Sequence, residues 1–490
     1  MSSMPQVTGH PKGLYTLFFT EMWERLSYYG MRALLVLFMV DSIQKGGLGL
    51  TDQTATAIYG LYTAGVYLAA LPGGWLADRL LGAQRAVWIG GAIIALGHFA
   101  LALPGTLPFF LGLILVVLGT GLLKPNVSAL VGDLYPEGGA RRDAGFTLFY
   151  MGINLGAALG PLVCSTLGEK MNWHYGFAAA GVGMVFGLIQ FRFTRHLLGP
   201  IGLPPQLPSA DRQRTLLALF IGLGILAAII ALAATGILVI QPVWLARRTA
   251  FVIVGLAIAW FGWAFLFAGL SFEEKQRLGV IALLFLASAM FWSGFEQAGS
   301  SLTLFADRHT DRILPGSTFE IPSGWFQSLN AGFVICFAPG VAALWMTLGR
   351  RQVVIPLVAK LALGLVLLAA GFLVVALGAR RALQTGPVWP SWLIVTYLLH
   401  TWGELFLSPV GLSSVTKLAP KRLVGQMMGI WFLATSLGNL IAGLFAGEVS
   451  GDNAAAMPAR FLQVVATAGG TGLLLLLISK PIQRMIGKVH

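Results

Sequence analysis

Charged residues are scarce in this 490-residue sequence. Only 10% of its residues are Asp, Glu, Lys or Arg, 57% are hydrophobic, and the mean hydropathy is +0.79. Soluble domains carry about 25% charged residues, so this composition excludes a soluble globular domain and indicates a protein that crosses a membrane many times. The net charge of +13 would suit a nucleic-acid binder, but the basic residues lie scattered in short loops and form no single patch.

Cysteines and catalytic motifs are also scarce. The two cysteines, Cys164 and Cys336, lie in apolar stretches, which predicts small core residues without a disulfide or metal role. No histidine belongs to an H-E-x-x-H motif and no serine lies in G-x-S-x-G. A membrane peptidase or acyltransferase needs a metal cluster or an activated nucleophile, so we expect no enzyme, no metal site and no cofactor. No cleavable signal peptide is evident before the first apolar run.

Apolar runs of about 20 residues, the length that crosses a bilayer as a helix, predict the fold. We expect an all-α polytopic membrane protein with fourteen spans in groups of six, two and six: 14–39, 54–77, 86–103, 107–131, 144–167, 175–193, 215–240, 249–270, 278–301, 324–347, 353–377, 391–415, 424–447 and 457–479. The predicted parts are a six-helix bundle (1–195), a linker with two extra transmembrane helices (196–277), a second six-helix bundle (278–482) and a cytoplasmic tail (483–490).

The distribution of basic residues predicts the orientation. With the N-terminus in the cytoplasm, Lys and Arg in cytoplasmic segments outnumber those outside by about two to one, which places both termini inside. The extra pair near 215–240 and 249–270 has no acidic or mid-span charged residue. We expect it to pack outside the twelve-helix core and assign it no function.

The loop between the second and third spans, residues 74–85, reads GWLADRLLGAQR. It resembles the loop signature of the major facilitator superfamily, G-x-x-x-D-R-x-x-G-x-[RK], with one extra residue before the last basic position. Asp78 can accept charge-assisted hydrogen bonds from an arginine or a helix end, which predicts a gating loop of Asp78, Arg79 and Arg85. The alternative is a loop that serves topology only. Residues 348–351, LGRR, resemble a degenerate copy of this signature that lacks the aspartate. A related loop in each half is expected for two bundles that rock around a midplane site.

The first span carries a stripe of polar residues. Counted from Glu21, the others follow at offsets of 3, 4, 7, 8 and 11, which is one face of a helix: Glu24, Arg25, Tyr28, Tyr29 and Arg32. A charge at membrane depth costs from about 3 to more than 10 kcal/mol. The stripe therefore faces a protein interior or a water-filled cavity, and it is either functional or a buried structural network of ion pairs.

Few other polar or amphipathic residues lie at membrane depth: Tyr67, Lys124, Tyr150, Asn154, Trp292, Glu296, Gln297, Asn330, Lys360, His400, Glu404, Ser408 and Trp431. If Lys360 snorkels or faces elsewhere, one wall of the cavity is positive and the other negative. A zwitterion fits such a cavity, with its carboxylate toward Arg32 and Lys124 and its amine toward Glu404. Asn154 and Asn330 suit a peptide backbone, and the aromatic residues suit pocket walls.

Structural interpretations stand beside these assignments. Lys124 could snorkel, Glu296 could be structural, and Trp292 and Trp431 could be core residues. Asn154 and Asn330 could hold helices together. His400 lies one turn before Glu404 and could share its proton, although a satisfied core histidine is the simpler interpretation.

Several of these segments resemble a known family. Residues 21–29, EMWERLSYY, resemble the E-x-x-E-R-[FY]-x-Y-Y signature of the proton-dependent oligopeptide transporter family and depart from it only at Leu26. Residues 149–154, FYMGIN, resemble its F-Y-x-x-[IV]-N motif. The segments around Lys124, Glu296, Asn330, Glu404 and Trp431 are also similar to their family counterparts. The resemblance runs from about residue 12 to residue 480, includes the two extra helices of bacterial members, and implies the major facilitator superfamily fold.

The resemblance implies a function for each site residue. It implies uptake of di- and tripeptides with protons as the coupling ion. We also expect a monomer in a bacterial inner membrane. Arg32 and Lys124, helped by Tyr29, would bind the peptide C-terminus, and Glu404 the N-terminus. The remaining predicted substrate-binding residues are Tyr67, Tyr150, Asn154, Trp292, Asn330, Ser408 and Trp431. The predicted proton-coupling residues are Glu21, Glu24, Arg25 and Glu296.

A coupling hypothesis follows from these assignments. The peptide carboxylate competes for Arg32, frees Glu296 to take a proton, and separates the two bundles. Animal members of the family carry a histidine on the second span, which is absent here, so proton handling falls on carboxylates. Two alternatives stay open: a transporter of another small zwitterion or anion, such as nitrate or a drug, and an exporter that runs as an antiporter. Glu404 opposite Lys124 argues against a simple anion.

Overall fold

The structure is a computed structural model that describes residues 9–206, 208–353, 355–407, 415, 417–449 and 454–486. Within these residues the secondary structure is helical, apart from two isolated bridges that join Thr310 to Val388 and Ile313 to Glu320. Twelve of the described helices are long and apolar enough to cross a membrane. The predicted all-α polytopic membrane protein is confirmed.

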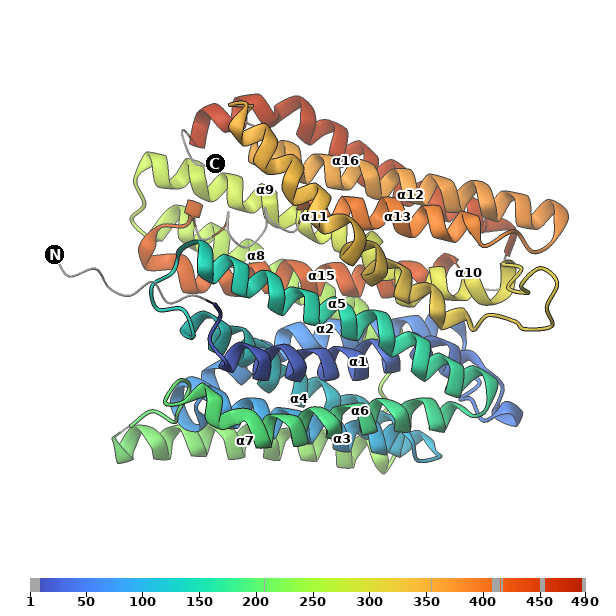
Figure 1. Cartoon of the computed structure of the whole chain (residues 1–490), viewed down its shortest axis with the longest axis horizontal. Helices are drawn as coiled ribbons and strands as arrows, with labels where there is room; N and C mark the ends of the chain where they lie inside the picture. Colours follow the sequence, from blue (N-terminus) through green and yellow to red (C-terminus); the bar gives the residue numbers. More distant parts are fainter. Residues whose placement is uncertain are drawn as a thin grey trace. The chain divides into compact units, whose positions relative to one another are not determined.

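Helices occupy the predicted spans wherever the structure describes their residues (Figure 1). The first eight are α1 (Gly13–Val40), α2 (Asp52–Leu76), α3 (Ala83–Leu101), α4 (Thr106–Asp133), α5 (Gly139–Lys170), α6 (Trp173–Thr194), α7 (Ser209–Ala234) and α8 (Pro242–Phe267). The others are α9 (Phe272–Phe295), α10 (Ser301–His309), α11 (Ser328–Arg350), α12 (Leu357–Thr385), α13 (Ser391–Leu407), α15 (Val424–Val449) and α16 (Met457–Ile486). Two predicted spans are not among the twelve, because α1 carries buried charges and α13 has only 17 described residues.

The predicted span at 278–301 is not one continuous helix. α9 begins earlier because Ser271 caps it: the Ser271 hydroxyl accepts from the Glu274 N–H (3.2 Å), and the Glu274 carboxylate accepts from the Ser271 N–H (2.9 Å). α9 ends at Phe295, and the 3₁₀ turn Glu296–Gly299 leads into α10. The break places Glu296 at a helix end.

Contacts divide the chain into two compact units. Unit 1 consists of Met1–Gly30, Ala69–Gly160 and Phe177–Leu238, and unit 2 of Met31–Leu68, Pro161–Gly176 and Val239–His490. Four helices, α1, α2, α5 and α6, therefore contribute one part to each unit. These boundaries, which follow contacts between residues, differ from the predicted bundles and linker at 1–195, 196–277 and 278–482. That division of the chain stays a prediction.

Small residues bring helices together within unit 1. A Cβ atom at Gly90 of α3 would lie 2.7 Å from the Gly119 carbonyl oxygen of α4, and a Cβ atom at Gly119 would lie 2.6 Å from that of Gly90. Such close approach is typical of helix packing in membranes. In unit 2, α12 packs along α13 and α16 (Figure 1).

The two extra helices bury little of their surface. Within its own helix, α7 buries Thr215 and no other residue, and its most apolar stretch is entirely unburied. α8 buries a narrow face in unit 2, formed by Ala246, Ile253, Ala257 and Ala264. Both observations support the expected position outside the core.

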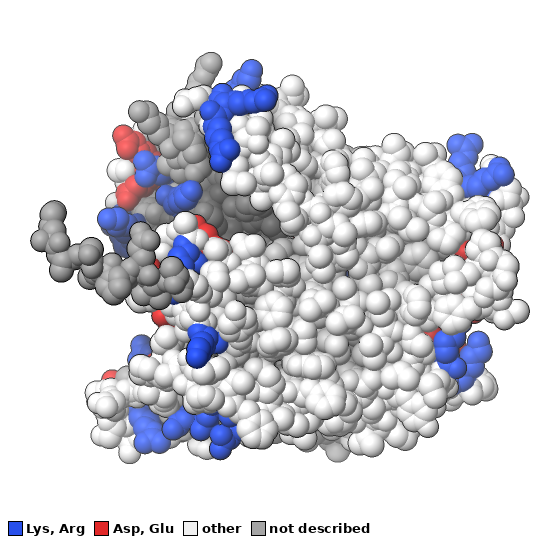
Figure 2. Space-filling view, viewed as in Figure 1, with Lys and Arg blue, Asp and Glu red and all other residues white. Residues whose placement is uncertain are grey.

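Exposed charged side chains are scarce between the ends of the helices. In Figure 2 the visible Lys and Arg side chains gather near helix ends, and the surfaces between carry almost none. One expectation about the apolar segments is wrong: Cys164 is buried, but Cys336 on α11 is exposed. Lipid tails are as apolar as a protein core, so an apolar neighbourhood cannot tell a lipid-facing residue from a core residue.

Candidate functional site

Arg25 binds two carboxylates in unit 1. Its Nε lies 3.1 Å from Glu21 Oε1 and also bonds to Glu24 Oε2. The three residues expose between 0% and 3% of their surface, so the predicted stripe does face a protein interior. Lys124 of α4 acts electrostatically on Glu21. Two carboxylates thus share one bonded arginine, and Lys124 is close enough to interact with Glu21.

Glycines of α5 cover this charged stripe. A Cβ atom at Gly156 would lie 2.2 Å from the Met22 carbonyl oxygen and 2.9 Å from Arg25 Cβ. At Gly160 it would lie 2.4 Å from the Leu26 carbonyl oxygen. Glycine is required for this contact, because any side chain would push α5 away from α1. The close approach excludes water from the charges and strengthens their attraction.

Arg32 pairs with Glu296 in unit 2. Arg32 Nη2 lies 2.6 Å from Glu296 Oε2, and the two residues expose 6% and 4% of their surface. Arg32 Nε donates a hydrogen bond to the Tyr59 hydroxyl. This ion pair joins α1 to the turn that follows α9. Hydrogen bonds between charged groups are the strong ones in proteins, and burial raises the energy needed to break them.

Tyr59 of α2 is a site residue that sequence reasoning missed. It is fully buried, and it lies against Gly299, where a Cβ atom would be 2.0 Å from the Tyr59 hydroxyl oxygen. Only glycine leaves room for this hydroxyl beside Arg32. A signal was present, because Tyr59 and Tyr67 lie eight residues apart and therefore share one helix face.

Glu404 is positioned by Asn330. The Asn330 amide donates to Glu404 Oε2 (2.9 Å) and to Thr401 Oγ1 (3.0 Å), which joins α11 to α13. This supports the interpretation that Asn330 holds helices together, and it also orients the half-buried Glu404 carboxylate. Asn154, by contrast, donates to the Tyr150 carbonyl oxygen within α5 (2.9 Å).

His400 is a core histidine. Its ring lies 4.8 Å from the Phe372 ring, and a Cβ atom at Gly371 would lie 2.4 Å from His400 Cδ2. The imidazole therefore packs against α12, and the structure favours the core interpretation over a proton shared with Glu404. The Lys360 ammonium lies 4.6 Å from the centroid of the Trp345 ring, a cation–π contact within unit 2.

The two predicted pocket tryptophans are both partly buried. Trp292 contacts Phe291 and Phe295 with ring centroids 5.5 and 5.4 Å away. Trp431 packs against the same hydrophobic cluster. Their surroundings fit a pocket wall and a core edge equally well. Ser408 lies outside the described residues.

The predicted gating loop is held differently from what its motif suggests. Asp78, Arg79 and Arg85 are exposed, and Asp78 forms no hydrogen bond or ion pair in the described part of the chain. The loop is instead anchored by Gln84, whose amide donates to the carbonyl oxygens of Ile201 (2.6 Å) and Gly199 (3.2 Å). The role of Asp78 as a latch stays a prediction.

Burial separates the two predicted groups of site residues. All four predicted proton-coupling residues expose 4% or less of their surface. Most predicted substrate-binding residues are only half-buried: Tyr29, Tyr67, Lys124, Tyr150, Trp292, Asn330, Glu404 and Trp431. Arg32 and Asn154 are the buried members of that group, at 6% each. The half-buried polar and aromatic side chains are partly open to a ligand in this conformation, whereas the proton-coupling residues are enclosed by protein.

Comparisons with known proteins identify the family of this chain. A model of the POT family matches residues 84–457. The peptide transporter YePEPT of Yersinia enterocolitica subsp. palearctica is 43% identical over 494 residues, which is 98% of this chain and 96% of that protein. The di-/tripeptide transporter of Lactococcus lactis subsp. cremoris is 37% identical, with 98% of each chain covered.

A solved structure is similar over the same length. The crystal structure of a peptide transporter POT in complex with sulfate is 42% identical and has a TM-score of 0.89, over 99% of this chain and 98% of that one. These relatives are transporters and not enzymes, in agreement with the absence of catalytic motifs. The chain is therefore a multi-pass membrane protein with the major facilitator superfamily fold, and it belongs to the POT family.

Proposed function

We propose that this chain is a monomeric symporter that imports di- and tripeptides together with protons, by alternating access across a bacterial inner membrane with both termini in the cytoplasm. The proposal rests on the buried ion pair between Arg32 and Glu296. A peptide carboxylate can take the place of Glu296 beside Arg32, and a proton can neutralise Glu296 when Arg32 is no longer its partner. The names of the relatives, a peptide transporter and a di-/tripeptide transporter, support the substrate class.

The ends of a peptide match the charges of the predicted site. Its carboxylate would bind Arg32 and Lys124, with Tyr29 alongside, because a guanidinium can hold a carboxylate by two parallel hydrogen bonds. Its amine would bind Glu404, whose direction Asn330 sets. Side chains of the peptide would meet Tyr67, Tyr150, Trp292 and Trp431, which offer adaptable apolar contact. Such a site would select strictly for the two charged termini of the peptide and only loosely for its side chains.

Competition for Arg32 couples the peptide to the proton. When the peptide carboxylate binds Arg32, Glu296 loses its partner at 2.6 Å and is left as a buried charge. Isolated buried carboxylates take up a proton, because desolvation disfavours the ionised form. Neutral Glu296 no longer attracts Arg32, so the contact between α1 and the turn after α9 weakens.

The cluster around Arg25 would supply a second proton site. Glu21 and Glu24 share Arg25, and each has one carboxylate oxygen without a hydrogen-bond partner among the described residues. A proton on either carboxylate would leave one negative charge opposite the positive charge of Arg25. The proposal therefore needs protons as its coupling ion and no other cofactor.

Uptake of radiolabelled dialanine into proteoliposomes tests this function. We expect an inward proton gradient to drive accumulation, and excess unlabelled dipeptide to abolish it. Nitrate and free alanine should not compete, which serves as the matched control for another anion or zwitterion. Uptake that ignores the gradient would overturn proton coupling, competition by nitrate would overturn peptide selectivity, and export under the same gradient would indicate an antiporter.

A further inference from the structure

The last turns of α5 present a polar face that the proposed transport site does not use. Ser165, Thr166 and Glu169 follow Leu162 at offsets of 3, 4 and 7, so they share one side of the helix. All lie in unit 2, together with the segment that precedes α11. In the proposed orientation this end of α5 faces the outside of the cell.

The segment Ser323–Trp325 packs directly on this face. Glu169 accepts the backbone N–H of Ser323 at Oε2 (2.6 Å) and that of Gly324 at Oε1 (2.9 Å). The Trp325 indole donates to Thr166 Oγ1 (2.9 Å). A Cβ atom at Gly324 would lie 2.0 Å from Ser165 Oγ, so the two segments approach as closely as glycine permits. Glu169 thus grips the backbone of the α11 segment with both oxygens.

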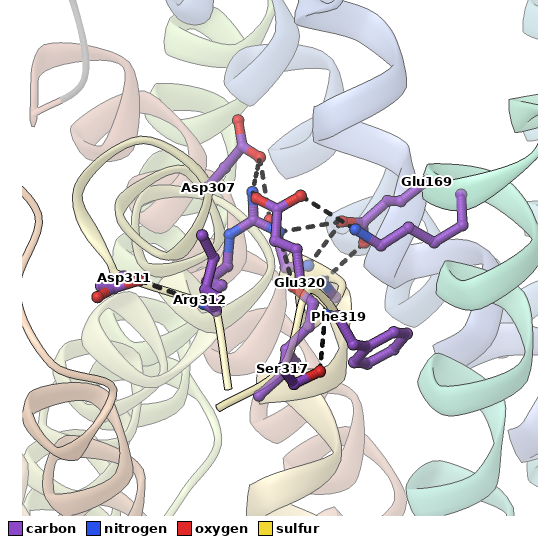
Figure 3. Close-up of polar contacts among 12 residues, drawn as sticks. Glu169, Asp307, Asp311, Arg312, Ser317, Phe319 and Glu320 are labelled. Carbon is purple, nitrogen blue, oxygen red and sulfur yellow. Dashed lines mark hydrogen bonds and ion pairs between the residues drawn. The ribbon is translucent and has the colours of Figure 1, made fainter. Parts of the chain in front are cut away.

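Charged side chains surround this contact (Figure 3). Arg312 lies 3.9 Å from Glu169 Oε2 and also pairs with Glu320 (2.8 Å) and Asp307 (3.4 Å). Asp307 in turn accepts from the Ser323 hydroxyl (3.0 Å). The Arg312 side chain is 10% exposed, and its Nε has no partner among the described residues. One mostly buried arginine side chain therefore links three carboxylates beside the contact.

A cavity of about 440 Å³ lies against the same residues. It is lined by α1, the turn between α5 and α6, α10 and the loop before α11, including Asp41, Trp173 and Arg308. Its walls carry four acidic and four basic side chains: Asp41, Glu169, Asp307, Glu320, Lys45, Lys170, Arg308 and Arg312. Water can therefore reach the Glu169 contact and replace its hydrogen bonds when the contact opens, so opening leaves no buried polar group unsatisfied.

We infer that Glu169 is a positioning residue that latches α5 to the start of α11 and holds the transporter closed at this end. The inference rests on the proposed function, because alternating access requires the α5 and α11 ends to separate in one half of the cycle. A carboxylate held by two backbone N–H groups suits this task. The donors are backbone N–H groups, whose positions do not depend on side-chain rotamers. Both hydrogen bonds are charge-assisted, and both are lost when Glu169 leaves the segment.

Distance measurement by electron spin resonance tests the latch. Spin labels are attached at Met171→Cys, at the end of α5, and Trp389→Cys, before α13, where the native side chains are 67% and 68% exposed. The background carries Cys164→Ala and Cys336→Ser so that only these positions react. In Glu169→Gln, we expect the population with longer label distances to rise roughly tenfold, because hydrogen bonds to a charged group are lost.

Two further variants keep the test decisive. Glu320→Gln is the matched control: it removes a neighbouring, largely exposed carboxylate and should leave the distances unchanged. Gly324→Ala should open the contact by steric pressure while Glu169 remains. Thermal unfolding of each variant separates opening from misfolding. Unchanged distances in a folded Glu169→Gln variant, or equal opening in Glu320→Gln, would overturn the inference. The measurement needs neither peptide nor proton gradient, so its result is independent of the uptake assay.

Discussion

Two buried charge clusters lie on α1, and they are built in different ways. Arg25 in unit 1 meets Glu21 and Glu24 on its own helix, within one turn. Arg32 in unit 2 meets Glu296, which is far away in sequence and lies in the turn after α9. One cluster is local and forms wherever the helix forms. The other exists only when distant segments are assembled.

This difference indicates a division of labour between the clusters. A pair on one helix keeps its distance when helices move, so the Arg25 cluster can carry a charge or a proton through a conformational change. A pair between helices changes with their packing, so the Arg32–Glu296 pair can report and control that packing. Mutations that remove one partner from each cluster should therefore have unequal effects.

Arg32→Ala should have the largest effect on stability. It leaves Glu296 buried without its ion-pair partner, which costs about 3–5 kcal/mol of unfolding free energy. The double variant Arg32→Ala/Glu296→Gln should recover most of that loss but no dipeptide uptake. Denaturant unfolding in detergent measures both. If the single and double variants were equally destabilised, the pair would not be the long-range contact described above.

Glu296→Gln alone should uncouple transport. The side chain keeps its shape but cannot take a proton, so accumulation of dialanine under a proton gradient should fall at least tenfold. Counterflow exchange of labelled for unlabelled peptide should survive, because it needs no net proton movement. Both assays use the same vesicles, and exchange is the control. Peptide-driven acidification that persisted in this variant would contradict the coupling hypothesis.

Glu21→Gln should destabilise less than Arg32→Ala, because Arg25 keeps its bond to Glu24. We expect a loss of about 1.5 kcal/mol, the lower end of the range for a hydrogen bond to a charged group. Unfolding under the same detergent conditions gives the comparison. Glu24→Gln is the matched variant and should behave alike if the two carboxylates share the arginine. A loss as large as that of Arg32→Ala would remove the distinction between a local and a long-range cluster.

Glu320→Gln should have the smallest effect and provides the surface reference for both clusters. Its ion pairs with Lys170 (3.0 Å) and Arg312 are largely exposed on the Glu320 side, so the loss should be about 0–1 kcal/mol. The hydrogen bond from Lys170 lowers the pKa of Glu320 below its usual value. The contribution of Glu320 is therefore present at neutral pH and disappears as the pH falls through that lowered pKa. The thermal unfolding temperatures of the parent protein and of Glu320→Gln should therefore converge as the pH is lowered into the acidic range.

Much of the fold was predictable because membrane-spanning helices are recognisable in a sequence by the length and hydropathy of their apolar segments. Helical periodicity predicts that the polar residues of 21–32 share one face toward a protein interior or a water-filled cavity, and Glu21, Glu24, Arg25 and Arg32 are all buried. Other features were not predictable. The break at Glu296–Gly299 has no proline to mark it, and Tyr59 becomes a site residue only through its contact with Gly299.

The sequence by itself determined the spans, the stripe on α1 and the sharing of Arg25 by two carboxylates, because helical periodicity decides which residues of one helix are neighbours. Only the tertiary structure decided that Arg32 meets Glu296, that Asn330 orients Glu404, and that Glu169 grips the backbone before α11. The physical reason is the solvent. In a membrane both lipid and protein interior are apolar, so hydropathy places a helix in the bilayer without choosing its neighbours.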